Sequence, residues 1–477
     1  MNEKSFNNKD FNKNDSDKKE LVQGRDLLET KKNLERTVLV CYSNKSDKEN
    51  SHTEDSLKEL KFLAETAGAE VIETFYQSNS NYDSRYMIGK GKAEEVSKFA
   101  EDNDIALVIF ENELAFTQIR NLEKKIKCRI IDKSNLILDI FAANARTAQA
   151  KLQVELAQLE YLLPRLTRQW THLSKQFGGI GSKGPGETQI ETDRRMIGAK
   201  IALLKEKLKK VDRQRQTQSE DRKTFFRISL VGYTNVGKST LLNLLTDSDV
   251  LVENKLFATL DTSTRILNLA GKGKKDNPAK FPKKVLISDT VGFIKNLPHG
   301  LIESFKSTLA EVIESDLLLH VIDLSNPKFE EQIEVVDKTL KEIGAENKNI
   351  LHVFNKVDRL QELMIDNDII EELRKKYPSS VFISAEKGIN MKFLIEALKN
   401  EFGKDNIETI VKLEVGDYKG LSDLYEKGQV KDVKYLKSGI KVKLTTSSKN
   451  ISAIKPDKEV QNRLKTRTVK KKTAKEV

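Results

Sequence analysis

The chain has 477 residues, a formal net charge of +11, 38% hydrophobic residues and only two cysteines. This length is too great for one ordinary domain and predicts about three or four. No apolar run is long enough to cross a membrane, and the first residues lack the hydrophobic core of a signal peptide. Cys41 and Cys128 show no metal-ligand spacing, which argues against a disulfide framework and indicates a reducing compartment. We therefore expect a cytoplasmic protein, and its positive charge favours an anionic partner, nucleic acid first.

The N-terminal part divides into a polar tail and a small domain. Residues 1–35 are mostly Asn, Lys, Asp and Glu, so we expect a disordered tail. Residues 36–144 carry strand-like runs at 37–42, 70–76 and 105–110 and a helix-like run at 57–67. Alternating strands and helices predict a small α/β domain with a parallel sheet. The segment 88–92 (IGKGK) fits either a phosphate-contacting loop or a flexible turn, and the turn is favoured.

Residues 145–224 have the pattern of two long helices. Two apolar seams repeat at alternating steps of four and three residues, which is typical of helices that pack along their length. The first seam is Leu152, Leu156, Leu159, Leu163 and Leu166, and the second is Ile197, Ile201, Leu204, Leu208 and Val211. We expect them to form an antiparallel helical hairpin, followed by a charged linker.

A glycine-rich segment, FGGIGSKGPGETQ at 177–189, separates the two seams. Glycines let a backbone approach another surface closely, and basic side chains around the segment would attract phosphates. Those side chains are Arg165, Arg168, Lys175, Lys183, Arg194 and Arg195. Composition alone fits an RNA-facing loop and a slack linker about equally. Trp170, on the approach to the segment, fits base stacking or packing against the hairpin, and packing is favoured.

The stretch GYTNVGKST, Gly232 to Thr240, fits the P-loop spacing G-x-x-x-x-G-K-[ST]. An apolar strand-like run precedes it and a leucine-rich helical run follows, which is the context that the motif requires. Backbone N–H groups of such a loop surround a β-phosphate, Lys238 reaches the β- and γ-phosphates, and the Ser239 hydroxyl binds Mg²⁺. The alternative is a glycine-bearing turn with an accidental lysine. The later motifs make that alternative weak, and a P-loop domain is expected over residues 225–402.

Two further segments fit the phosphate side of such a site. The sequence LFATLD at 256–261 is switch-like, and Thr259, Thr262 and Thr264 are rival candidates for a hydroxyl that completes the Mg²⁺ shell. The apolar run 285–288 leads into DTVG at 289–292, a Walker B pattern that places Asp289 near the metal and the Gly292 N–H near the γ-phosphate.

The base side is indicated by two later strand ends. The run 350–354 leads into Asn355-Lys356-Val357-Asp358, where Asp358 can accept from guanine's N1–H and exocyclic amine while Lys356 packs along the base. The run 381–383 leads into Ser384-Ala385, whose backbone can donate to the guanine carbonyl. His320 and His352 lie within apolar strands and are expected to be core or edge residues, neither ligands nor general bases.

The C-terminal region contains a small unit and a tail. Residues 403–446 alternate strand-like runs around a helix-like stretch at 420–427, which predicts a small α+β domain. Residues 447–477 are basic and have no core, so we expect a disordered tail that can touch RNA nonspecifically. The predicted fold class is therefore multidomain α/β.

These motifs together resemble the HflX family of ribosome-associated P-loop GTPases. The resemblance rests on GYTNVGKST, FATLD, DTVGFI with LPHGLIESFKSTL, NKVD, and above all GGIGSKGPGETQIETDRR at 178–195. It covers about residues 36–446 and implies binding to the large ribosomal subunit and its rRNA, with a role in ribosome splitting, rescue or biogenesis. It also selects Thr259 as the second Mg²⁺ ligand beside Ser239. Some relatives carry proline after FATLD, where this chain has Thr262.

The predicted function is hydrolysis of GTP to GDP and phosphate by a monomer with Mg²⁺ as cofactor. The residues expected to contact nucleotide are Gly232, Tyr233, Thr234, Asn235, Val236, Gly237, Lys238, Ser239, Phe257, Ala258, Thr259, Leu260, Asp261, Asp289, Thr290, Val291, Gly292, Asn355, Lys356, Val357, Asp358, Ser384, Ala385 and Glu386. Many small GTPases have glutamine after the DxxG glycine, where this chain has Phe293. We therefore expect slow hydrolysis that ribosomes stimulate, and no catalytic base is identified. The alternative is an RNA-binding, nucleotide-sensing module in which hydrolysis is incidental.

Overall fold

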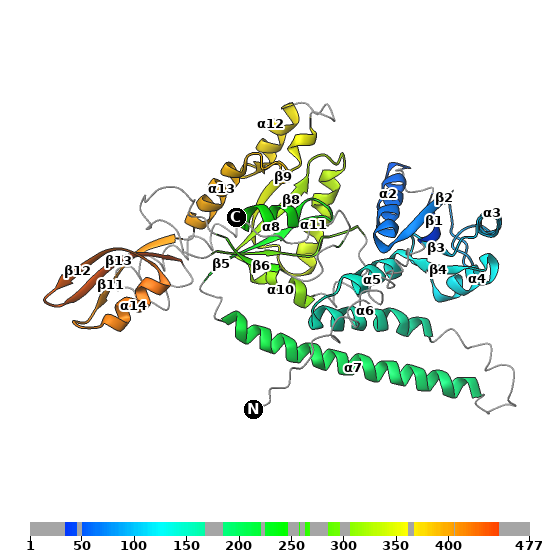
Figure 1. Cartoon of the computed structure of the whole chain (residues 1–477), viewed down its shortest axis with the longest axis horizontal. Helices are drawn as coiled ribbons and strands as arrows, with labels where there is room; N and C mark the ends of the chain where they lie inside the picture. Colours follow the sequence, from blue (N-terminus) through cyan, green and yellow to red (C-terminus); the bar gives the residue numbers. More distant parts are fainter. Residues whose placement is uncertain are drawn as a thin grey trace, which may run out of the picture.

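The computed structural model describes residues 34–44, 50–166, 185–220, 225–246, 257, 263–267, 285–295, 306–360, 367–404 and 406–447. The two predicted tails lie almost wholly outside these residues. Figure 1 shows an N-terminal α/β domain, a long helical hairpin, a central P-loop domain and a small C-terminal unit. This arrangement confirms the predicted multidomain α/β fold class.

The N-terminal domain is built on a four-stranded parallel sheet with the order β2-β1-β3-β4. Its strands are β1 (Glu35–Asn44), β2 (Ala69–Asn79), β3 (Leu107–Phe110) and β4 (Arg129–Asp132), and its helices are α2 (Asn50–Ala67), α3 (Lys90–Asp102), α4 (Phe116–Ile126) and α5 (Lys133–Asn144). Helices α2 and α5 pack on one face and α3 and α4 on the other. Because both faces are covered, the central strands are continuous apolar runs rather than alternating ones.

The helical hairpin consists of α6 (Ala148–Leu166) and α7 (Pro185–Glu220). The predicted seams pack together as expected, with Leu156, Ile201, Leu204 and Leu208 buried between the helices. Lys200–Glu155 and Lys205–Glu160 ion pairs join their flanks. Helix α7 begins at Pro185, because proline at a first helical position loses no hydrogen bond. The prediction that the loop extends to Gln189 is therefore wrong at that end, and the rest of the predicted loop falls in residues 167–184, outside the described part.

The P-loop domain contains a six-stranded sheet with the order β10-β9-β8-β5-β7-β6, in which β6 is antiparallel to β7 and the other pairs are parallel. Its strands are β5 (Phe226–Val231), β6 (Ser263–Leu267), β7 (Val285–Asp289), β8 (Leu317–Asp323), β9 (Asn349–Asn355) and β10 (Val381–Phe382). Helices α8 (Lys238–Thr246) and α13 (Met391–Lys404) pack on one face. Helices α10 (Lys306–Glu314), α11 (Phe329–Glu342) and α12 (Asn367–Lys376) pack on the other.

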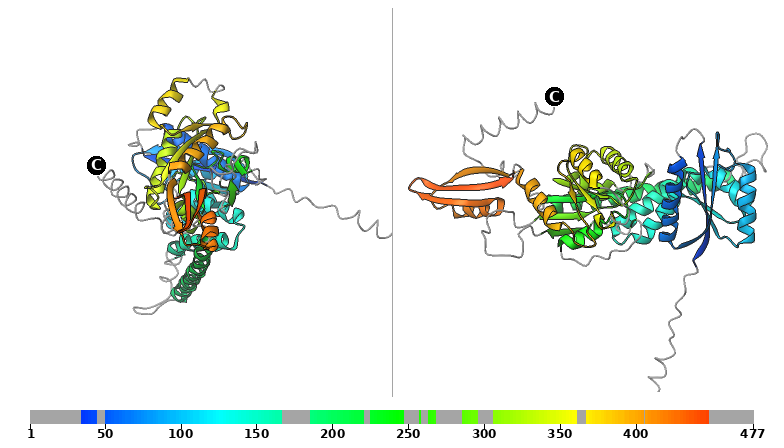
Figure 2. Two further views of the ribbon diagram at one scale, coloured as in Figure 1. Left: turned by 90° about the vertical axis from the view of Figure 1, so that its left-hand side faces the viewer. Right: turned by 90° about the horizontal axis from the view of Figure 1, so that it is seen from above.

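The C-terminal unit is an antiparallel sheet with the order β11-β13-β12 and one helix, as predicted. It comprises β11 (Asn406–Leu413), α14 (Tyr418–Lys427), β12 (Gln429–Leu436) and β13 (Gly439–Ser447). Its small core, which includes Val411, Leu424 and Val442, lies between the sheet and α14. Figure 2 shows this unit and the N-terminal domain at opposite ends of the P-loop domain. The C-terminal unit therefore lies far from the surface that the N-terminal domain covers.

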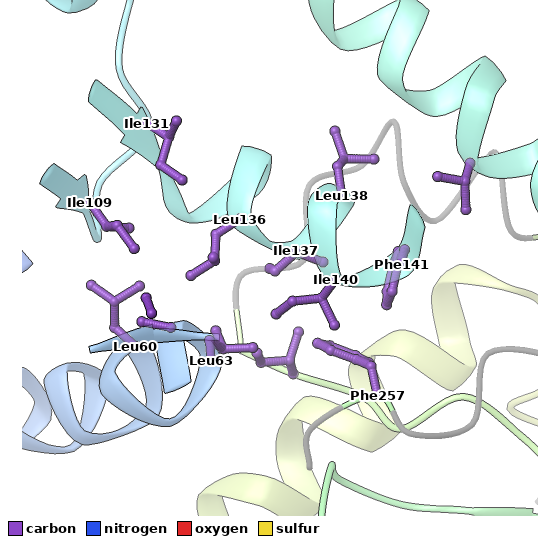
Figure 3. Close-up of a cluster of buried hydrophobic side chains, with 14 of the residues drawn as sticks. Leu60, Leu63, Ile109, Ile131, Leu136, Ile137, Leu138, Ile140, Phe141 and Phe257 are labelled. Carbon is purple, nitrogen blue, oxygen red and sulfur yellow. The ribbon is translucent and has the colours of Figure 1, made fainter. Parts of the chain in front are cut away.

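One hydrophobic cluster joins three parts of the molecule. It contains Leu60 and Leu63 of α2, most of the apolar side chains of α5, and Val154 of α6. Phe257 and Ile294 of the P-loop domain are buried in the same cluster. Figure 3 shows Phe257 beside Ile140 and Phe141, facing α2 across the cluster. The N-terminal domain and the hairpin therefore share a core with two segments that flank the P-loop.

Candidate functional site

The P-loop lies between the end of β5 at Val231 and the start of α8 at Lys238. Gly232 and Gly237 have φ values of +152° and +93°, in the region that favours glycine. A Cβ on Gly232 would lie 2.3 Å from the carbonyl oxygen of Val321, and one on Gly237 would lie 2.4 Å from Asn355 Nδ2. Both positions therefore require glycine, and the loop places its amides at a helix N-terminus, a favourable place for phosphate.

Lys238 and Ser239 are held at the base of this loop. The Lys238 ammonium donates to the carbonyl oxygens of Gly232 (3.2 Å) and Tyr233 (2.7 Å). Burial lowers the pKa of Lys238 to about 8, although nearby Asp289 acts in the opposite direction. The Ser239 hydroxyl donates to Asp289 Oδ2 at 2.5 Å. These two motifs, separated by fifty residues of sequence, thus meet directly.

The donor set beside Lys238 fits a magnesium ion. Mg²⁺ prefers oxygen ligands and is usually held by one or two protein groups together with phosphate oxygens and water. Ser239 and Asp289 supply a hydroxyl and a carboxylate in contact. No group of three or more His, Cys, Asp or Glu side chains that could hold a metal occurs among the described residues, so this part of the chain offers no rival cage.

The DTVG segment, defined here as residues 289–295, pairs with the P-loop through its backbone. The Phe293 N–H donates to Gly232 O (3.1 Å), and the Thr234 N–H donates to Phe293 O (2.9 Å). The Phe293 side chain is 5% exposed and packs with α10 and α11 on the far side of the sheet. The residue at the usual glutamine position therefore presents no polar group to the phosphate side, in agreement with its chemistry.

The base side is held together by Asn355. Its Nδ2 donates to the carbonyl oxygen of Val236 in the P-loop (2.8 Å), and its Oδ1 accepts from the Ala385 N–H (2.9 Å). The sequence predicts that the backbone of Ser384-Ala385 donates to the guanine carbonyl, and in this structure the Ala385 N–H donates to Asn355. The neighbouring Ser384 N–H donates to Ile389 O (3.3 Å). The side-chain amide of Asn355 thus joins the N-K-x-D motif to the P-loop and to the loop after β10.

Two charged side chains complete the base side. Lys356 has a left-handed backbone (φ +64°) and its ammonium binds both Asn235 O (2.9 Å) and Asp323 Oδ2 (2.6 Å), which extends its stem along the P-loop. Asp358 Oδ1 is buried and has no hydrogen-bond partner among the described residues. A hydrogen bond from Ser384 lowers the pKa of Asp358, so this carboxylate is ionised and ready to accept. Val357 and Glu386 lie beside these groups in the same two loops.

Phe257 is the one residue of the switch-like segment that the structure describes. Ala258, Thr259, Leu260, Asp261 and Thr262 lie outside the described residues. The Phe257 side chain is 3% exposed, with its ring 4.7 Å from that of Phe141. Its carbonyl oxygen accepts from Asn144 Nδ2 at 2.9 Å. Helix α5 therefore anchors the chain at Phe257, two residues before the candidate metal ligand Thr259.

The two strand histidines lie in the P-loop domain, as predicted. His320 in β8 is 1% exposed, and its ring is 5.5 Å from that of His352 in β9, which in turn contacts Tyr377 at 4.5 Å. Burial lowers the pKa of His320 to about 3 and that of His352 to about 4. Both rings are therefore neutral near pH 7 and act as packing residues.

Sequence analysis missed the contacts between the N-terminal domain and the P-loop. The Tyr233 hydroxyl donates to Glu59 of α2 at 2.5 Å, and Lys133 of α5 pairs with the same carboxylate at 3.2 Å. Burial and the Glu59 charge raise the pKa of Tyr233, which keeps its phenol protonated. The only signal in the sequence is a large aromatic residue in a loop that otherwise needs small ones. Nothing in the local pattern around Glu59 pairs it with a residue 174 positions away.

A mostly parallel sheet whose central strand ends in this phosphate loop, with a Walker B aspartate and an N-K-x-D loop at the ends of two other strands, defines a P-loop GTPase. Family models agree: residues 54–142 match a GTP-binding GTPase N-terminal region, 144–222 a GTP-binding GTPase middle region, and 227–356 a model described as 50S ribosome-binding GTPase.

Similar curated proteins are named GTPase HflX. The protein of Flavobacterium psychrophilum is 48% identical over 72% of this chain and 81% of its own length. That of Caldanaerobacter subterraneus is 42% identical over 87% and 92%. The chain therefore belongs to the HflX family of GTPases, and it hydrolyses GTP. Among solved structures, a GTP-binding protein from Sulfolobus solfataricus in complex with GDP is 25% identical, with a TM-score of 0.42, over 77% of this chain and 99% of that one.

Proposed function

We propose that this GTPase acts on ribosomes, binding the large subunit and its rRNA and serving in ribosome splitting, rescue or biogenesis. The observation that carries the proposal is the match of residues 227–356 to the 50S ribosome-binding GTPase model. The net charge of +11 and the exposed Arg194 and Arg195 of α7 support an RNA partner. No helix among the described residues is both long and apolar enough to span a membrane. We also propose that the protein is cytoplasmic and monomeric.

The residues of the nucleotide site have the following proposed roles. The amides of residues 232–239 surround the β-phosphate, Lys238 neutralises charge between the β- and γ-phosphates, and Asp358 accepts from guanine. Ser239 and Thr259 would hold Mg²⁺, with Asp289 orienting the Ser239 hydroxyl. When bound, Mg²⁺ neutralises charge that develops on the phosphates. Since Phe293 cannot orient water, we propose that hydrolysis is slow until a ribosome completes the site.

The deciding experiment is multiple-turnover GTP hydrolysis with and without purified large subunits. We expect at least a tenfold rise in kcat on addition of large subunits, with small subunits as the matched control. An unchanged rate would contradict the proposed stimulation. Sedimentation of the protein with each subunit, in the presence of GTP analogue or GDP, tests binding separately from turnover.

A second candidate function is an RNA-binding module that senses nucleotide, in which hydrolysis is incidental. The exposed basic residues of α7 favour this alternative, because they can bind RNA without GTP hydrolysis. A variant that binds GTP without turning it over separates the two functions. If such a variant still splits or rescues ribosomes repeatedly, the module is correct and the enzymatic role is wrong.

The glycine-rich segment between the helices is the proposed rRNA-facing part. Replacing Gly178, Gly179 and Gly181 together by valine should impair ribosome binding and leave GTP affinity nearly unchanged. Gly198, in the middle of α7, provides the control, because a Cβ there meets nothing within 4 Å. Loss of Arg194 and Arg195 should instead reduce the salt dependence of binding. Normal ribosome binding by the triple variant would show that the segment is only a linker.

A further inference from the structure

The side chain of Tyr233 contacts three separate parts of the molecule. Its hydroxyl accepts from the Lys295 N–H of the DTVG segment at 2.9 Å and donates to Glu59 of the N-terminal domain at 2.5 Å. Its ring packs against both the shared cluster and the core of the P-loop domain. Tyr233 thus connects the P-loop to which it belongs with the DTVG segment and with α2.

The Glu59 carboxylate is itself held in place. Its side chain is 15% exposed, and it pairs with Lys133, whose side chain is 6% exposed and which also approaches Glu111 at 3.9 Å. Removing one partner of such a partly buried ion pair is costly in free energy, because the other charge is left uncompensated. Glu59 therefore offers Tyr233 a fixed acceptor, and the N-terminal domain contributes directly to the position of the tyrosine ring.

The DTVG segment lies close against the P-loop at Gly292. A Cβ on Gly292 would lie 2.8 Å from Thr234 Cα and 2.9 Å from Lys238 Nζ. A γ-phosphoryl group bound to the lysine ammonium must stand between that ammonium and the Gly292 backbone, because both are its donors. Binding of GTP therefore displaces Gly292 and pulls on the next residue, Phe293, whose backbone bonds to Gly232 and Thr234 hold the segment on the P-loop.

The residues that follow resist this movement. Ile294 is 2% exposed within the shared cluster, and the next amide, that of Lys295, is bound by Tyr233. A diphosphate has no γ-phosphoryl group and does not require Gly292 to move. Any contact that stabilises this closed arrangement therefore opposes the triphosphate and leaves the diphosphate unaffected, by thermodynamic linkage.

We propose that the Glu59–Tyr233–Lys295 contact holds the DTVG segment on the P-loop and thereby lowers the affinity for GTP relative to GDP. Glu59 is a positioning residue, which acts on the nucleotide through Tyr233 and touches no phosphate. The N-terminal domain is then part of the machinery that discriminates between the two nucleotides. This inference rests on the GTPase assignment and is independent of the ribosome proposal, since it concerns the protein alone.

The test measures GDP and a non-hydrolysable GTP analogue binding to the full chain without ribosomes. Glu59→Ala should tighten the GTP analogue about tenfold, the equivalent of one net hydrogen bond, and should change GDP affinity less than about twofold. Glu59→Gln keeps an acceptor for Tyr233 and should restore most of the wild-type ratio. Glu113→Ala is the matched control, because its carboxylate accepts from Ser134 in the same domain and makes no described hydrogen bond to Tyr233 or Lys133.

Two outcomes would overturn the proposal. Unchanged affinities for both nucleotides in Glu59→Ala would show that the contact does not restrain the DTVG segment, and equal changes in both affinities would show a purely structural role. Hydrogen exchange in the wild-type protein provides a check that needs no variant. The GTP analogue should expose the Lys295 amide to exchange whereas GDP should not, and equal protection with both nucleotides would also contradict the proposal.

Discussion

The two ends of the nucleotide site are built in different ways. At the base end, Asn355 joins the P-loop to the loop after β10, and every contact described for Asp358 and Lys356 comes from the P-loop domain itself. At the phosphate end, Phe257 and Ile294 are buried against the N-terminal domain and the hairpin. The base end is therefore a property of one domain, whereas the phosphate end is shared between domains.

In the part of the chain that the structure describes, the N-terminal domain can therefore influence the site only at its phosphate end. Guanine recognition should be insensitive to the position of the N-terminal domain, because no contact from that domain reaches Asn355 or Asp358 among the described residues. The phosphate side changes between GTP and GDP, and it is the side on which Tyr233, Phe257 and Ile294 contact α2 and α5. Movements of the N-terminal domain should thus alter how the protein distinguishes triphosphate from diphosphate, and should leave base selectivity unchanged.

Lys238→Ala should have the largest effect on the phosphate end. Removal of a buried ammonium that contacts phosphate should weaken binding of both GTP and GDP by about 1000-fold. Nucleotide titration measures the loss, and circular dichroism should show that the chain stays folded. Lys392→Ala, on the exposed side of α13, is the control. Near-normal affinity in Lys238→Ala would mean that this loop does not bind phosphate.

Phe257→Ala should break the shared construction of the phosphate end. Truncating an aromatic side chain that is 3% exposed should destabilise its cluster by about 3 kcal/mol. Native-state hydrogen exchange in α5 would measure this change. Phe382→Ala, in β10 at the base end, should loosen the P-loop domain but leave α5 protected. If both variants affect α5 equally, the two ends are not separate in the way described.

Asp358→Asn should alter the base end alone. An amide cannot accept from both guanine donors, so GTP should bind about 100-fold more weakly. A nucleotide with a carbonyl in place of the 2-amino group should bind better. The ratio of xanthosine to guanosine nucleotide affinity measures the switch, with wild-type protein as control. A preference for GTP that survives the substitution would refute the assignment of Asp358 to the base.

Low pH should lower the free energy of unfolding of the P-loop domain, because the buried His320 in its central sheet becomes protonated on unfolding. Its pKa is about 3 in the folded protein and near 6.5 in the unfolded chain, so the unfolded chain binds more protons between these values. Stability is therefore fully present above pH 6.5 and falls as the pH decreases, by about 2 kcal/mol at pH 5. Urea unfolding of the P-loop domain at pH 7.5 and pH 5 measures this loss. His320→Leu should remove this part of the loss and leave the comparable part that His352, with a pKa of about 4, contributes. An unchanged pH dependence would contradict the explanation.

Asp55→Ala should have the smallest effect on the shared interface. Asp55 of α2 pairs with Lys328, which precedes α11, at 2.8 Å, but both side chains are partly exposed. The pair should contribute less than about 1 kcal/mol, and salt should screen it. Urea midpoints at low and high salt measure the contribution. Glu330→Ala removes the Lys376 pair inside the P-loop domain and provides the comparison. A loss above about 2 kcal/mol would show that this contact is more than a surface ion pair.

Much of the fold and the base end could be predicted, because the relevant signals are local in sequence. The spacing of the two apolar seams predicts the hairpin. The P-loop and N-K-x-D motifs each follow an apolar strand, and these strands end at the same edge of the sheet. The start of α7 at Pro185 was missed because the glycines around it outweighed one proline.

The shared phosphate end could not be predicted, because its contacts join residues that are far apart in sequence. Phe257 reads locally as part of a switch, and only the tertiary structure places it against Phe141. Glu59 is one of several charged residues in an ordinary amphipathic helix, where carboxylates are common. The engagement of the Ala385 N–H by Asn355 was hidden for the same reason, since thirty residues separate the two groups.

The length of α7 gives the hairpin the character of a lever. With 36 residues the helix is about 54 Å long. Its partner α6 is fixed near the switch-like segment by the hydrogen bond from Tyr161 to Asp132 and by Val154 in the shared cluster. These contacts lie level with the middle of α7, where Leu204 packs against Leu156, so a tilt of about 10° about them would carry the Pro185 end of a rigid helix through about 5 Å. A displacement of side chains around Phe257 too small to disturb the core would thus become a movement of several ångströms at the Pro185 end of the hairpin.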